Sequence, residues 1–170
     1  YDSGNMVQLF RAFRFFKRKN IPVLTEYQVI SKVDFFRMLF FIIVYPLSVV
    51  RLMKSLKTSY EDQLLASALW ESLDDVIANS YLRLLFGKKV CQLPVPAIQC
   101  ISWCENQARH KTFYRGLHDI PGKVTIIGAQ LFLWPESMLN LHLDEEEKKF
   151  GVIPDETLVN GDYYLSSSSS

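Results

Sequence analysis

The stretch AIQCISWCENQARHKTFYRGLHDIPGKVTIIGAQ, residues 97–130, decides the fold class of this 170-residue chain. It begins with AIQCISW, an apolar run typical of a buried strand, and it contains KVTIIG, in which a second strand is expected over residues 123–127. The segment between these runs is interpreted as a helix that ends near Gly116. A strand, a helix and a strand in this order predict a βαβ unit, and therefore an α/β fold with a parallel sheet flanked by helices.

The pattern upstream of this unit is mainly helical. The segment NMVQLFRAFRFFKRKN carries apolar side chains at helical spacing, and IPVLTEY (21–27) is interpreted as a strand that follows that helix. A longer helical pattern begins after an N-cap at Ser59 and is expected to stop at Gly87. The pair Asp74–Asp75 is a candidate break that would divide this pattern into two helices.

Residues 38–50, MLFFIIVYPLSVV, form the most hydrophobic part of the chain and carry no charge. A membrane-spanning helix needs about 20 apolar residues, and this run is shorter and is interrupted by Pro46. Three interpretations remain open. The run is a helix buried in the core, or an interfacial segment whose neighbours Arg37, Arg51 and Lys54 face anionic lipid headgroups, or a true span.

Charge is divided unevenly along the chain. Residues 1–60 hold ten Lys or Arg and three Asp or Glu, a net charge of +7, whereas residues 61–170 hold nine and fifteen, a net charge of −6. This asymmetry indicates either an anionic partner for the first part or a solvated basic helix face. The Phe residues of RAFRFFKRKN (11–20) are interpreted as helix core rather than as stacking platforms for bases, so no nucleic-acid partner is expected.

The cysteines and the short motifs indicate neither a disulfide framework nor a cofactor. Cys91, Cys100 and Cys104 are odd in number and lack paired spacing, which favours a reducing compartment and thiols that belong to the core. The chain has no glycine-rich phosphate or dinucleotide loop. We therefore expect no metal and no resident cofactor.

Polar side chains follow each predicted strand. Glu105, Asn106 and Gln107 come directly after AIQCISW, Gln130 follows the second strand, and Asn160 lies in PDETLVNG. Ligands of open parallel sheets bind beyond the carboxyl ends of the strands, so these residues are predicted to line one polar pocket. A carboxylate serves as a general base and amides bind sugar hydroxyls, but the same residues also suit the cap of the next helix.

The order WCENQARHKTFYRGL, GKVTIIGAQLFLWP and FGVIPDETLVNGDYYL resembles bacterial surface-carbohydrate biosynthesis proteins of the GT-B glycosyltransferase type. The likeness covers about residues 60–165, and one departure is Cys104, where such proteins have an aromatic residue before the Glu. The resemblance implies a Rossmann-like half of a GT-B architecture with a helical insertion. Residues 1–165 would be a single acceptor-side domain of a longer protein, and the serine run 166–170 a linker or tag.

The same resemblance implies a function in lipopolysaccharide or capsule synthesis. A sugar would pass from a nucleotide-sugar donor to a glycan or lipid-linked acceptor, with Glu105 as the catalytic base. Asn106, Gln130 and Asn160 carry over as substrate-binding residues, and Gln107 adjoins them. The donor would bind a second domain, so this part by itself is expected to be inactive, in the cytoplasm or peripheral on the inner membrane. The alternative is a non-catalytic, membrane-associated assembly module.

Overall fold

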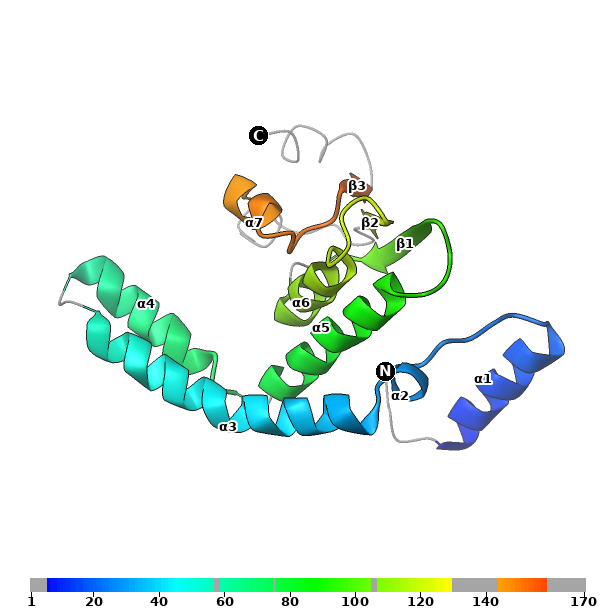
Figure 1. Cartoon of the computed structure of the whole chain (residues 1–170), viewed down its shortest axis with the longest axis horizontal. Helices are drawn as coiled ribbons and strands as arrows, with labels where there is room; N and C mark the ends of the chain where they lie inside the picture. Colours follow the sequence, from blue (N-terminus) through cyan, green and yellow to red (C-terminus); the bar gives the residue numbers. More distant parts are fainter. Residues whose placement is uncertain (1–5, 57–58, 75, 105–106, 130–143, 159–170) are drawn as a thin grey trace.

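The computed structural model describes residues 6–56, 59–74, 76–104, 107–129 and 144–158 (Figure 1). Within these residues the chain is α/β, with its strands in the second half and most of its helices before them. The elements are α1 Met6–Arg18, α2 Glu26–Val29, α3 Lys32–Ser55, α4 Tyr60–Glu71, α5 Val76–Cys91, β1 Ile98–Trp103, α6 Ala108–Leu117, β2 Val124–Ala129, α7 Glu145–Lys149 and β3 Glu156–Leu158.

The sheet is parallel and three-stranded, in the order β1-β2-β3. β1 and β2 pair along their whole length, from Ile98 opposite Val124 to Trp103 opposite Ala129. β3 continues the sheet on the far side of β2, with Ile127 opposite Glu156. The predicted βαβ unit, β1–α6–β2, is therefore confirmed, and so is the α/β class.

Helices α5 and α6 cover one face of this sheet (Figure 1). The buried cluster joins Ile126 and Val124 of β2 to Tyr114 and Leu117 of α6 and to Cys91 at the end of α5. The alternation of side chains along β1 directs Ile101 to the opposite face, where it is 69% exposed. Among the described residues the sheet is thus packed against helices on one side.

The close contact of α5 with α6 depends on two glycines. A Cβ atom on Gly87 would lie 2.5 Å from the Phe113 carbonyl oxygen, and one on Gly116 would lie 2.3 Å from that of Leu84. The two backbones touch, so neither position has room for a side chain. The expected helix stop at Gly87 is therefore wrong, because this glycine lies inside α5 and permits the crossing.

The helical region before the sheet begins and breaks at side-chain caps. Ser31 and Ser59 cap α3 and α4, each accepting a hydrogen bond from the backbone N–H of the aspartate three residues later. The backbone N–H of Val76 donates to Asp74 Oδ1 at 2.9 Å, where α5 starts. The predicted N-cap at Ser59 and the predicted break near Asp74 are both confirmed.

The strand expected in residues 21–27 is wrong. Residues 21–25 lie outside regular structure, and Thr25 is the N-cap of the short helix α2. The Gln28 side chain accepts a hydrogen bond from the Thr25 backbone N–H at 2.9 Å, which fixes this helix start. A short apolar run with a β-branched residue does not form a strand when a local cap favours a helix.

Candidate functional site

The carboxyl ends of the three strands meet at one edge of the sheet. Trp103 lies opposite Ala129, and Ala129 lies opposite Leu158, so β1, β2 and β3 end at the same level. The backbone N–H of Cys104 extends this pairing by donating to the Ala129 carbonyl at 3.1 Å. The predicted site residues follow these ends in the sequence. Those that lie outside the described residues are Glu105, Asn106, Gln130 and Asn160.

Gln107 is the predicted site residue that the structure describes at this edge. It is the N-cap of α6, and its carbonyl oxygen accepts hydrogen bonds from the His110 N–H at 2.8 Å and the Lys111 N–H at 3.0 Å. Its side chain is exposed. The capping interpretation thus applies to the backbone of Gln107, and the residue lies exposed at the carboxyl end of β1.

The layer beneath this edge is tightly packed. Cys104 is buried, and a Cβ atom placed on Gly128 would lie 2.9 Å from the Cys104 Cβ and 2.7 Å from Pro154 Cγ. Gly128 therefore has no room for a side chain between Cys104 and Pro154. The cysteine at position 104, which is the departure from the resemblance, lies buried in this layer.

Asp155 and His118 connect the third strand to the rest of the sheet. Asp155 Oδ2 accepts a hydrogen bond from the Ile126 N–H at 2.7 Å, and the Asp155 N–H donates to the Ile126 carbonyl at 2.9 Å. His118, at the end of α6, lies 2.9 Å from the Gly151 carbonyl through Nδ1 and 3.3 Å from Asp155 through Nε2. Local sequence patterns did not predict these contacts, because the residues that make them lie far apart in the sequence.

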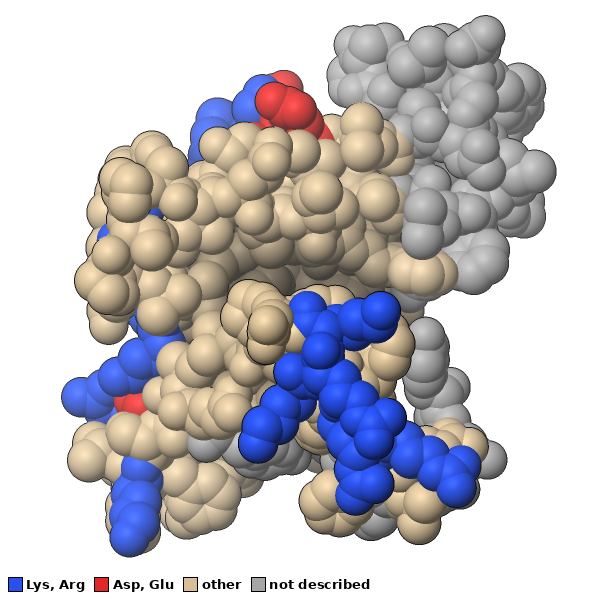
Figure 2. Space-filling view, turned by 90° about the vertical axis from the view of Figure 1, so that its right-hand side faces the viewer, with Lys and Arg blue, Asp and Glu red and all other residues tan. Residues whose placement is uncertain are grey.

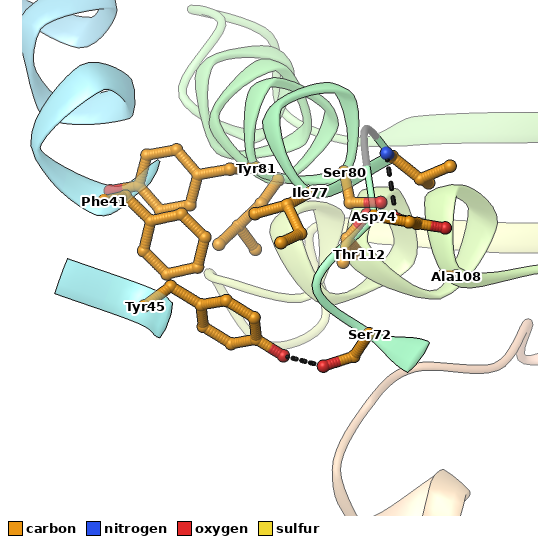
Figure 3. A pocket seen from close by; sticks show the side chains of 11 residues that line it. Phe41, Tyr45, Ser72, Asp74, Ile77, Ser80, Tyr81, Ala108 and Thr112 are labelled. Carbon is orange, nitrogen blue, oxygen red and sulfur yellow. Dashed lines mark hydrogen bonds between the residues drawn. The ribbon is translucent and has the colours of Figure 1, made fainter. Parts of the chain in front are cut away.

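A cavity of about 360 Å³ lies between α3, α5 and the first turns of α6 (Figure 3). Its aromatic side comes from Phe41, which stacks on Tyr81 with ring centroids 4.2 Å apart, and from Tyr45, whose hydroxyl is 2.8 Å from Ser72 Oγ. Ala108, the residue after Gln107, is part of the wall. The apolar cavity therefore adjoins the helix start that follows the carboxyl end of β1. The remaining lining residues are Asp74, Val76, Ile77, Ser80, Leu84 and Thr112.

Sequence reasoning did not find this cavity. Its wall combines residues of α3, α5, α6 and the α4–α5 connection. In the sequence, each of these residues by itself has the pattern of an ordinary helix core. An apolar cavity with a few polar groups is the usual form of a small-molecule site. The sequence feature that lies nearest to this cavity is the predicted break at Asp74, which separates α4 from α5.

The predicted membrane-facing residues all lie exposed on α3. Arg51 and Lys54 are in its last turns, and Arg37 lies near its start, 3.5 Å from Asp34. Asp34 itself is buried, and its carboxylate also lies 3.5 Å from the Lys89 ammonium group of α5. Burial alone would raise the pKa of Asp34, but the hydrogen bonds from Ser31 and the charge of Lys89 outweigh it, and the pKa is lowered.

The interpretation of residues 38–50 as a buried helix is wrong for this chain. They belong to α3, which continues through Pro46 and buries only Met38 and Val49 of this run. Among the described residues, α3 is the one helix with the length and apolar composition to cross a membrane. The hydrophobic run is therefore available on the surface rather than used in the core.

The thiols and the phenol near the sheet are held in the core. Cys91 and Cys104 are buried, Cys100 is partly buried, and none of the three forms a disulfide. Burial raises the pKa of Cys100 and also that of Tyr114, whose hydroxyl donates to the Trp103 carbonyl at 3.2 Å. The raised pKa values favour the protonated forms of Cys100 and Tyr114, and the Tyr114 hydroxyl supports the end of β1.

No family model, curated protein or solved structure matches this chain.

Proposed function

We propose that this chain is the acceptor-side, Rossmann-like half of a GT-B glycosyltransferase-like protein of surface polysaccharide synthesis. The observation that carries the proposal is the common edge at which β1, β2 and β3 end. Polar residues follow each of these ends in the sequence, and this is where open parallel sheets bind ligands. The resemblance of the motifs supplies the chemical class.

In the proposed reaction an acceptor hydroxyl attacks the anomeric carbon of a nucleotide-sugar. Glu105 takes the hydroxyl proton, the new glycosidic bond forms, and the nucleotide leaves with the electron pair of the broken C–O bond. Asn106, Gln107, Gln130 and Asn160 donate to and accept from the sugar hydroxyls. The nucleotide-sugar is held by a second domain, so the part of the protein described above binds acceptor alone.

The apolar cavity favours a lipid-linked acceptor over a free glycan. It adjoins the start of α6 through Ala108, next to Gln107, so that one molecule with a polar and an apolar part would contact both. Phe41, Tyr45 and Tyr81 offer aromatic surface to an isoprenoid or acyl chain. A free sugar would leave this cavity unused.

The test is sugar transfer by the full-length protein, measured with radiolabelled UDP-sugars and lipid-linked acceptors extracted from bacterial membranes. Glu105→Gln is expected to lower kcat by roughly a hundredfold or more, as removal of a general base does, with the melting temperature unchanged. Glu145→Gln, at the exposed start of α7, is the matched control and should transfer normally. Full activity in Glu105→Gln would remove Glu105 from the role of base.

The second candidate is a non-catalytic, membrane-associated assembly module. It is favoured by the exposed apolar surface of α3, which the transfer reaction does not require. Binding of isolated acceptor lipids and glycans, measured by saturation-transfer NMR on this chain, separates the two. Vesicle binding without any glycan contact would support the assembly module, whereas contacts that Gln107→Ala weakens would support the acceptor domain.

A further inference from the structure

One side of α3 presents a continuous apolar stripe to solvent. Its members are spaced four, three and four residues apart, which places them on a single helix face. Each is about two-thirds exposed: Phe36 67%, Phe40 68%, Ile43 67% and Leu47 67%. We call this set of four residues the docking face.

The opposite side of α3 is attached to the rest of the molecule. Asp34, Met38 and Val49 are its buried residues, and Asp34 pairs with Lys89 of α5. Phe41, on this side, stacks on Tyr81 of α5. The helix is therefore two-sided, with one side fixed by protein contacts and the other open.

Positive charge brackets the docking face. Lys32 and Arg37 lie at the start of α3 and Arg51 and Lys54 at its end, and all four are exposed. The acidic residue of α3 is Asp34, which is buried against cations. The exposed surface of the helix thus combines apolar side chains with cations at both ends.

A second element of the same character lies nearby in sequence. In α1, the exposed Phe10 and Phe15 accompany cations along one amphipathic helix. These cations are Arg11, Arg14, Lys17 and Arg18. Figure 2 shows Lys and Arg side chains gathered over the part of the molecule where α1 lies, with few acidic side chains among them. Amphipathic helices of this composition lie in the interface of anionic membranes.

We propose that the docking face binds an anionic lipid bilayer, with α3 lying in the plane of the membrane surface. The helix lies in the plane of the surface because its other side is fixed to α5, through the Asp34–Lys89 pair and the stacking of Phe41 on Tyr81, and so is not open to lipid. The side held by Asp34 and Lys89 stays out of the lipid. This surface operates whether or not the chain takes part in glycosyl transfer.

Charge favours a bilayer over a second copy of this chain. In a symmetric dimer through the docking face, the cations at the ends of one α3 would face the cations of the other, in either orientation of the helices. Such like-charge contacts are unfavourable, whereas anionic headgroups would neutralise the same side chains. The docking face is therefore complementary to phosphate-bearing lipid.

The experiment is flotation of the chain with vesicles of phosphatidylcholine, with and without phosphatidylglycerol. The chain should float with the anionic vesicles and bind neutral ones more weakly. The double variant Phe40→Gln with Ile43→Gln should bind at least about tenfold more weakly, because it removes exposed apolar surface that the lipid would cover. Phe150→Gln is the matched control, since Phe150 is also 68% exposed but lies beyond α7.

The cations are tested separately. Arg51→Gln with Lys54→Gln should lower binding to anionic vesicles by roughly 25-fold, at about fivefold for each charge, and leave neutral vesicles unaffected. Arg109→Gln with Arg115→Gln, two exposed cations of α6, should change little. Circular dichroism of each variant verifies that the helices are retained.

Four results would overturn the proposal. The first is failure of the wild-type chain to float with either vesicle, and the second is binding that the α3 variants do not weaken. The third is resistance to alkaline carbonate extraction, which would indicate that α3 spans the membrane. The fourth is a dimer in sedimentation velocity that Phe40→Gln dissociates, which would mean that a second copy of the chain covers this face. None of these results depends on transfer activity, which the Glu105→Gln assay measures separately.

Discussion

At the scale of single residues, Asp34 shows how one position acquires a role from its surroundings. The chain contains two similar caps, Ser31 with Asp34 and Ser59 with Asp62, each a serine followed three residues later by an aspartate. In both the serine Oγ donates to the aspartate carboxylate, at 2.6 Å and 2.7 Å. Asp34 is 1% exposed and contacts Lys89 of α5, whereas the Ser59–Asp62 pair is solvent-exposed. The same local pattern therefore only caps α4, whereas in α3 it caps the helix and also attaches it to α5.

This pair permits a controlled prediction. Asp34→Asn is expected to lower the free energy of unfolding by about 1–3 kcal/mol, because a buried charge-assisted pair loses its charge. Asp62→Asn should cost less than about 1 kcal/mol, as exposed caps and pairs do. Urea denaturation followed by circular dichroism measures both. Equal losses in the two variants would mean that Lys89 adds nothing to the cap.

The lowered pKa of Asp34 also fixes the sign of a pH effect. The carboxylate is favoured in the folded state, so its contribution is complete above the unfolded pKa of about 3.9 and is lost as the pH falls through the lower folded value. The stability difference between wild type and Asp34→Asn should therefore shrink below about pH 4.

At the scale of elements, the sequence predicted what depends on neighbours along the chain. The strands β1 and β2, the helix between them and the cap at Ser59 follow from local runs and side chains, and all were confirmed. Gly87 was misinterpreted because its role is set by Gly116, a residue of another helix. No local pattern distinguishes a glycine that ends a helix from one that lets two helices touch.

The crossing of α5 and α6 yields the prediction at this scale. Gly87→Ala would gain about 1 kcal/mol of helix propensity in a free helix. Here its Cβ would lie 2.5 Å from the Phe113 carbonyl oxygen. This oxygen belongs to the backbone of α6, so the helix itself would have to shift to relieve the clash. We expect a net loss of about 1–3 kcal/mol in the free energy of unfolding, as overpacking produces. Gly122→Ala has no atom within 4 Å of its Cβ and tests the backbone term alone, since its φ is +72°.

The outcome for Gly87→Ala is read from urea denaturation against wild type. If Gly87→Ala is as stable as wild type, the helices separate more easily than the contact distances imply. Gly116→Ala should then be equally harmless, because its Cβ would meet the Leu84 carbonyl oxygen from the other side of the same crossing.

At the scale of the whole molecule, apolar side chains are divided between a core and a surface. The core joins α5, α6 and the sheet, whereas α1 and the α3–α4 pair extend away from it (Figure 1). The sequence showed that residues 38–50 are apolar but not which surface covers them, because burial depends on contacts that hydropathy does not record. The predicted site is tested only at the strand ends and at Gln107, since Glu105, Asn106, Gln130 and Asn160 lie outside the described residues.

This division predicts unequal local stability, which amide hydrogen exchange can measure. The side chains of Leu117 and Ile126 are fully buried, whereas α4 buries none of its side chains. Amides of β2 and α6 should therefore exchange only by global unfolding, and those of α4 by local opening. We expect exchange in β2 to be at least roughly a hundredfold slower, a difference of about 2.7 kcal/mol in opening free energy. Equal protection in α4 and β2 would show that the α3–α4 pair belongs to the same cooperative unit as the sheet.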